Sequence, residues 1–161
     1  MSMKIVFLAE YDNEIPLGKN KITTDLSILF EPSISIDAFS IHPYHWSFEL
    51  TTQEIGRDKY LLRYAMGSMC LFDCCDAELV IPKSRRGKVY ACFSSPPCAD
   101  GIYYSKYSTF QEKKYYDAKN KIFAVGDISE SYGKCVEFVS GQFAVINDVG
   151  ELVAIYVCID Q

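Results

Sequence analysis

The chain has 161 residues, 49% hydrophobic and 23% charged, which argues against intrinsic disorder and suffices for one domain with its own core. No segment approaches the ~20 apolar residues of a membrane helix. The apolar run from Ile5 to Ala9 is too short for a signal-peptide core. We therefore expect a single β-rich domain over residues 1–161, located in the cytoplasm and without a membrane contact.

The formal charge of -5 is unevenly distributed. Residues 1–55 carry three Lys against eight acids, residues 56–120 eleven Lys/Arg against seven acids, and residues 121–161 two Lys against six acids. The ends of small domains often lie close together, so the two acidic ends could form one face that attracts a basic partner. A solvated surface of uneven charge is the alternative. The carboxylates that we predict for an acidic partner-binding face are Asp12, Glu14, Asp148 and Glu151.

The first fifty residues contain several strand-like runs. Lys4 to Leu8 is apolar on both faces, a pattern that predicts a strand in the middle of a sheet. Pro, Gly, Asn and Asp gather at residues 12–20 and predict a loop there. Residues 24–30 alternate again, and Pro32 should end that run. The inward side chains of this strand would be Leu26, Ile28 and Phe30.

A change of phase predicts a β-bulge near Ala38, and the alternation from Trp46 to Leu50 predicts a further strand. Residues 58–72 fit two structures. A strand would turn Tyr60, Leu62, Tyr64 and Met66 inward, whereas a helix would gather a longer apolar stripe. Gly67 and the β-favouring tyrosines favour the strand.

Short strands are expected at residues 78–81 and 88–93, on either side of a basic loop at residues 82–87 that contains Arg85 and Arg86. The capping-box pattern from Ser108 to Gln111, with the polar residues that follow to Asn120, predicts a surface helix. Residues 121–125 should return to strand.

The last third of the chain predicts a β-meander. Three strand-like runs are separated by Ser140-Gly141 and by Asn147 to Gly150, which have the composition of tight turns. The run from Leu152 to Ile159 is apolar on both faces, so it lies either in the centre of the sheet, which we favour, or in an interface. The predicted fold class is α+β, predominantly antiparallel β: a strongly bent sheet or partial barrel with one or two short helices.

Both histidines lie close together in sequence, at His42 and His45. Histidine suits acid–base catalysis and zinc binding, but two residues three apart on an extended segment point to opposite faces. A turn packed by its aromatic neighbours is the favoured interpretation, and no metal or cofactor is expected.

Seven cysteines occur, and the segment from Cys70 to Cys75 holds three of them. The spacing of Cys70 and Cys74 falls within the range of a zinc knuckle, whereas Cys92 and Cys98 fall just outside it. Reduced, buried or incidental thiols are the favoured interpretation. A cysteine nucleophile paired with a histidine has no flanking motif in its support.

Aromatic and basic residues in the middle of the chain have the composition of a single-strand nucleic-acid surface. The acidic balance of the whole chain argues against that use, and Tyr and Trp are also common anchors of protein interfaces. The aromatic residues predicted to contact a protein partner are Trp46, Tyr103, Tyr104 and Tyr107.

The sequence carries no catalytic, nucleotide-binding or metal-binding motif with the required spacing. We therefore expect a binding protein that neutralises or occludes a basic protein partner. Small size, acidity and lack of an active-site motif give it the general character of a bacterial toxin-immunity protein. The alternatives are a His/Cys-dependent hydrolase-type enzyme and a β-barrel module that binds single-stranded nucleic acid or a small ligand.

Overall fold

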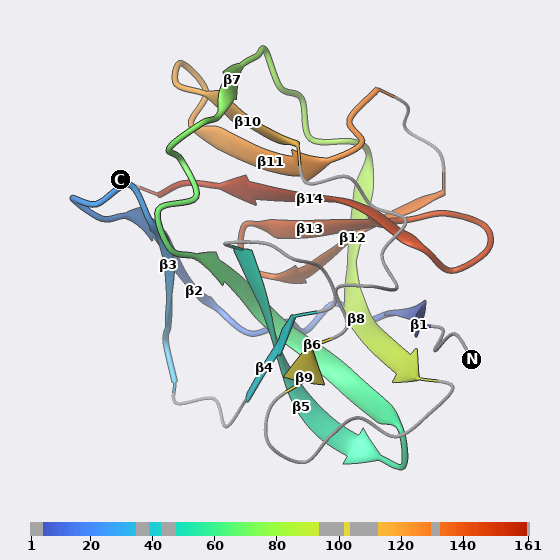
Figure 1. The fold of residues 1–161 in the computed structure, drawn as a ribbon. Coiled ribbons are helices and arrows are strands. Elements are labelled where there is room, and N and C mark those ends of the chain that lie inside the picture. Colours follow the sequence, from blue (N-terminus) through green and yellow to red (C-terminus); the bar gives the residue numbers. More distant parts are fainter. Residues whose placement is uncertain are drawn as a thin grey trace.

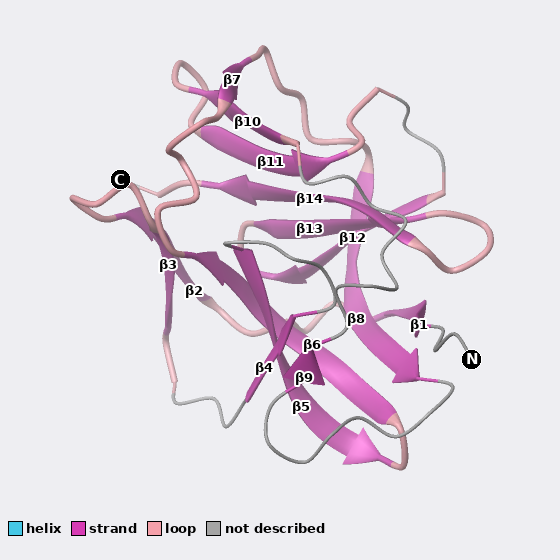
Figure 2. Cartoon of the chain, viewed as in Figure 1, coloured by secondary structure: helices cyan, strands magenta, loops and turns pink. Residues whose placement is uncertain are grey.

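The computed structural model describes residues 5–34, 39–42, 48–93, 102–103, 113–129 and 133–160. These residues form fourteen β-strands and no helix (Figure 2), so the described part has no helix long and apolar enough to cross a membrane. The strands are β1 Ile5–Tyr11, β2 Gly18–Ile22, β3 Ile28–Pro32, β4 Phe39–His42, β5 Phe48–Gly56, β6 Lys59–Gly67, β7 Cys75–Asp76, β8 Ser84–Phe93, β9 Ile102–Tyr103, β10 Lys114–Asp117, β11 Ile122–Gly126, β12 Lys134–Val139, β13 Gln142–Ile146 and β14 Leu152–Cys158.

The strands join into one curled, mixed sheet that forms a half-barrel (Figure 1). The hydrogen-bonded order is β7-β10-β11-β14-β13-β12-β8-β6-β5-β4-β9, with β1 beside β8, and β2 and β3 joined to β6. Strand β8 connects the two parts of the sheet. Its first residues pair in parallel with β12, and residues 90–92 pair antiparallel with β6.

Strand β14 lies between β11 and β13, which confirms the prediction that the doubly apolar C-terminal run is central. Ile155 and Val157 join the larger core cluster inside the half-barrel. Ala154 and Tyr156 face the other way, into a smaller cluster. Both faces of β14 are therefore covered, which is why its sequence shows no polar alternation.

A buried polar residue joins the meander to the N-terminal half of the chain. The amide nitrogen of Gln142 donates to the Ala65 carbonyl and to Asn20 Oδ1, both at 2.8 Å, and its oxygen accepts the Ala65 N–H at 2.6 Å. Asn20 in turn donates to the Ser140 carbonyl at 2.9 Å and receives the Asp160 N–H on its own carbonyl. Gln142 and Asn20 are fully buried, so these bonds satisfy groups that water cannot reach.

The predicted α+β class is wrong for the described residues, because no helix is present among them. The expected helix over 108–120 is replaced, where the chain is described, by strand β10 and a turn at residues 118–121. Tyr115 and Tyr116 lie in β10, opposite residues of the neighbouring strand β11. A position in a sheet suits aromatic side chains better than an exposed helix with a thin apolar stripe does. The capping-box residues 108–111 lie outside the described residues.

The predicted basic loop at residues 82–87 is also wrong in part, since β8 begins at Ser84 and contains both arginines. Residues 78–81 are not a strand, but Leu79 is buried in the smaller cluster. Strand β6 confirms the favoured strand over residues 59–67, and residues 68–72 form bends and turns. The predicted bulge near Ala38 lies outside the described residues.

The prediction of which β6 side chains point inward is correct only for the first half of the strand. Tyr60 and Leu62 are buried, but Ala65 replaces Tyr64 as the next buried position. The pairing with β5 slips by one residue at Arg63, and a bulge of this kind moves all later side chains to the opposite face. Tyr64 is only partly buried but still packs against the core cluster, where its ring stacks on Phe30 with centroids 5.1 Å apart.

Strand β1 has one strand partner among the described residues, β8, and so is an edge strand rather than the predicted central one. Phe7 faces the core, whereas Leu8 is 50% exposed. The predicted loop at residues 12–20 ends early because Gly18 starts β2, which forms a hairpin with β3. Leu26 is exposed in the turn of that hairpin, with a positive φ.

Candidate functional site

The segments near the two ends of the chain meet beside β1. The Phe7 N–H donates to the Gly150 carbonyl at 2.7 Å, which holds the turn between β13 and β14 against the outer edge of β1. This contact brings the predicted Asp148 and Glu151 next to the strand that leads to Asp12 and Glu14.

A groove of about 420 Å³ lies at this junction. Its walls are residues 6–9 of β1 on one side and residues 146–150 on the other, together with Lys134 at the start of β12. Leu8 is 50% exposed here and Val149 is 63% exposed. The groove thus presents apolar side chains and the exposed Asp148 carboxylate to the solvent.

Asn147 builds the turn that forms the second wall. Its side-chain oxygen accepts the N–H of Val149 at 3.1 Å and of Glu151 at 2.9 Å, and its amide nitrogen donates to the Glu151 carboxylate at 3.0 Å. Gly150 has a φ of +84°, and a Cβ atom there would lie 2.6 Å from Val6 Cγ1. Only glycine therefore fits this position without strain.

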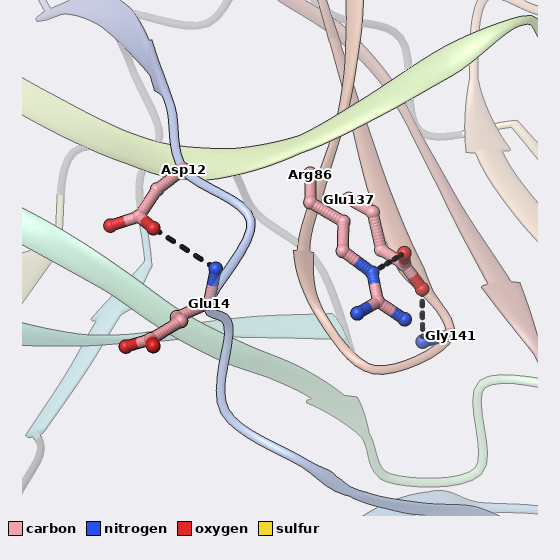
Figure 3. Close-up of polar contacts among 5 residues, drawn as sticks. All are labelled: Asp12, Glu14, Arg86, Glu137 and Gly141. Carbon is pink, nitrogen blue, oxygen red and sulfur yellow. Dashed lines mark hydrogen bonds and ion pairs between the residues drawn. The ribbon is translucent and has the colours of Figure 1, made fainter.

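The loop after β1 holds the predicted Asp12 and Glu14. The Asp12 carboxylate accepts the Glu14 N–H at 2.9 Å (Figure 3) and lies 3.4 Å from Lys88 Nζ. These two contacts hold the pKa of Asp12 below its ordinary value, the hydrogen bond from Glu14 being the larger cause. Glu10 lies opposite the same lysine in the β1–β8 register. One lysine thus faces a segment with three carboxylates.

The cations around the groove already have partners. Arg85 lies 3.8 Å from the centre of the Tyr11 ring, and Lys134 lies 5.8 Å from the same ring. Arg86 Nε contacts Glu137 at 3.2 Å, and the other oxygen of Glu137 accepts the Gly141 N–H (Figure 3). Each of these positive groups is held by an aromatic ring or a carboxylate.

Glu14 and Asp148, in contrast, are exposed and form no ion pair within the described residues. These two carboxylates, one in the wall of the groove and one in the loop after β1, therefore remain available to a partner as far as the described residues go. The basic residues of β8, which the sequence assigns to a free loop, are instead held in the sheet and paired.

The aromatic residues predicted to contact a partner add nothing to the groove beside β1. Trp46, Tyr104 and Tyr107 lie outside the described residues. Tyr103 belongs to β9, whose backbone pairs in parallel with β4. Of the two histidines, His42 ends β4 and His45 lies outside the described part.

Three buried or partly buried thiols, those of Cys70, Cys74 and Cys135, are poor nucleophiles. Burial raises the pKa of Cys70 and Cys74 to about 11 and that of Cys135 to about 12. Cys74 Sγ donates a hydrogen bond to the Cys70 carbonyl at 3.3 Å. Over the ranges that the structure describes, no three His, Cys, Asp or Glu side chains are placed to hold a metal ion.

No match was found for this chain among protein-family models, curated proteins or solved structures. The function therefore rests on the geometry of the chain itself.

A second groove of about 450 Å³ lies between the β2–β3 turn and the β5–β6 pair, and none of the predicted partner-binding residues lines it. The groove beside β1 is therefore the candidate site. Sequence reasoning does not single out Leu8, Tyr11, Lys134 or Val149. The signal for Leu8 is present, however, because a strand that is apolar on both faces but lies at an edge must expose one of them.

Proposed function

We propose that this chain is a small cytoplasmic protein-binding domain that neutralises a basic partner protein by occluding it, in the manner of a toxin-immunity protein. The groove beside β1 is the contact surface. One observation carries the proposal: the exposed apolar side chains of Leu8 and Val149 line the same groove as the Asp148 carboxylate, which forms no ion pair within the described residues.

The two components have different tasks. Leu8 and Val149 supply apolar area that binding removes from water, which stabilises the complex by about 25 cal/mol per Å² before the costs of association. Glu14 and Asp148 steer a positively charged partner and raise its association rate. A partner that bears Lys or Arg around an apolar patch fits both.

The experiment compares charge reversals at two places on the surface. Glu14→Lys with Asp148→Lys replaces the carboxylate in the wall of the groove and the one in the loop after β1. Within the part of the chain that the structure describes, neither side chain forms a hydrogen bond or an ion pair, so the variant is expected to remain folded. The control, Asp76→Lys with Glu78→Lys, changes the net charge equally at and just after β7, the far end of the sheet.

The tagged chain would be expressed in its native cells and its bound protein isolated, identified and purified. We expect a basic protein whose activity the chain inhibits, with affinity at least tenfold weaker for the groove variant and unchanged for the control. Equal affinity for both variants, or a bound protein that keeps its full activity in the complex, would contradict the proposal.

A further inference from the structure

The outer edge of β1 has backbone groups that no other described strand satisfies. In an antiparallel pair, alternate residues direct their N–H and C=O groups toward the partner strand and away from it. The Asp12 N–H bonds to the Arg86 carbonyl, whereas the Phe7 N–H bonds away from β8, to Gly150. The backbone N–H and C=O groups of the even-numbered residues of β1 therefore point toward β8. Those of Phe7, Ala9 and Tyr11 point toward the outer edge of β1.

Gly150 satisfies one of these groups, the Phe7 N–H. The Phe7 carbonyl and the N–H and C=O groups of Ala9 and Tyr11 have no backbone partner among the described residues. They span about 13 Å, four residue steps of extended chain. The groove lies beside the first part of this edge, along residues 6–9, so a further strand has room to approach there.

We infer that the groove takes an extended segment of the partner, which adds as a strand to the free edge of β1. This inference rests on the proposed function and specifies how the partner binds. Main-chain hydrogen bonds to Ala9 and Tyr11 would supply the contact that is independent of sequence, and side chains at alternate positions would supply the specificity.

The side chains of β1 define the chemistry of the added strand. Leu8 and Glu10 point to the exposed face of the sheet, and Asp148 stands across the groove. A segment with an apolar residue beside Leu8 and Lys or Arg beside Glu10 matches this surface, since neighbours on one face of a sheet interact in pairs. A second copy of the chain fits less well, because each copy carries a formal charge of -5.

Ala9→Pro tests the inference without breaking the existing ladder. The Ala9 N–H points away from β8, so proline removes an outward donor and no bond of the sheet. Ala9→Val, which keeps the N–H and is a good strand residue, is the matched control. Thermal unfolding of both variants checks that the fold is retained.

The probe is a random library of twelve-residue peptides displayed on yeast and selected on the wild-type chain. We expect enriched peptides in which Lys or Arg and an apolar residue stand two positions apart. They should bind Ala9→Pro at least tenfold more weakly and Ala9→Val equally well. The inference would be overturned if the selected peptides bind Ala9→Pro as tightly as the wild type. It would also be overturned if the selection yields no peptide whose binding depends on residue 9.

Hydrogen exchange gives a readout that does not depend on any variant. A selected peptide should slow exchange of the Ala9 and Tyr11 amides and leave the Leu8 and Glu10 amides, already bonded to β8, unchanged. If the peptide protects only amides elsewhere in the chain, strand addition is wrong. Sedimentation of the free chain gives a further check. A dimer that Ala9→Pro dissociates would assign the edge to a second copy and would also overturn the inference.

The native partner separates this inference from the proposed function. If Ala9→Pro retains the partner while the Glu14→Lys with Asp148→Lys variant loses it, the groove is the binding site but strand addition is wrong. If neither variant changes the affinity, the proposed function is wrong as well.

Discussion

Gln142 shows how a single buried polar side chain fixes the relation between distant parts of the chain. Its amide pairs with both backbone groups of Ala65 in β6 and with Asn20 in β2. All of these groups lie away from water, so a residue that fails to match them leaves donors or acceptors unsatisfied.

We therefore expect Gln142→Glu, which keeps the shape but loses both N–H donors, to lower the free energy of unfolding by about 3 kcal/mol or more. Gln53→Glu, the same change at a half-buried position of β5, should cost less than about 0.5 kcal/mol. Urea unfolding measures both. If the free energy of unfolding falls no more for Gln142→Glu than for Gln53→Glu, the amide contacts of Gln142 do not hold β13 to β2 and β6.

Asp117 is the second residue with a defined structural task. Its carboxylate accepts the N–H of Leu79 at 2.9 Å and the N–H and side-chain amide of Asn120 at 3.0 and 2.8 Å. These bonds, that from Leu79 first, lower the pKa of Asp117 below its ordinary value of 3.8. A lowered pKa in the folded state means that the stabilisation is present above pH 3.8 and is lost as the pH falls below it.

Asp117→Asn should accordingly reduce stability at neutral pH and flatten the loss of stability below about pH 4. Thermal melts from neutral to acidic pH would test both effects. Asp148→Asn, which removes an exposed carboxylate, serves as the control and should leave the curve unchanged. A curve for Asp117→Asn that runs parallel to that of the wild type would refute the assignment.

Among the elements, the turn from Asn147 to Glu151 sets the shape of the groove. Gly150→Ala must place a side chain at a φ of +84° and against Val6. We expect a loss of about 1–3 kcal/mol in the free energy of unfolding and faster exchange of the Phe7 amide, whose acceptor would move. Gly56→Ala is the control, since no atom lies within 4 Å of the added Cβ. Similar stability of the two variants would show that the turn is not under this constraint.

The strands show which sequence signals are reliable. The C-terminal meander is predictable because Ser140-Gly141 and the turn at Asn147 separate three long apolar runs. Bulges are harder to predict, because they depend on the partner strand: a register shift in the β13–β14 pair moves Leu152 into the core cluster of Ile155 rather than that of Ala154. The polar strand β2 is missed for a related reason, since its buried Asn20 is stabilised by contacts distant in sequence.

The helix expected at 108–120 illustrates the competition between local and tertiary preferences. The lysines and the capping-box pattern favour a helix, but the edge of β11 offers backbone partners to Lys114 to Asp117. Pairing with an existing sheet satisfies these backbone groups and half-buries Tyr115 and Tyr116. Tertiary pairing thus outweighs a weak local propensity.

In the molecule as a whole, the location of the candidate site follows from topology more than from motif. The acidic character of both ends is visible in the sequence, but the contact of β1 with the β13–β14 turn is not, because it joins residues far apart along the chain. The pairing of Arg86 with Glu137 and of Lys88 with Asp12 also requires the fold to be known. The sequence could therefore predict which carboxylates to consider, but not the groove or its apolar wall.

The proposed binding of a partner to this surface can be tested directly by photo-crosslinking in the native cells. A photoreactive amino acid would replace Leu8 in one experiment and Val80, which is 81% exposed beside the buried Leu79, in another. If the groove beside β1 is the binding site, the basic partner is captured from position 8 and not from position 80. Capture from position 80 with none from position 8 would contradict it.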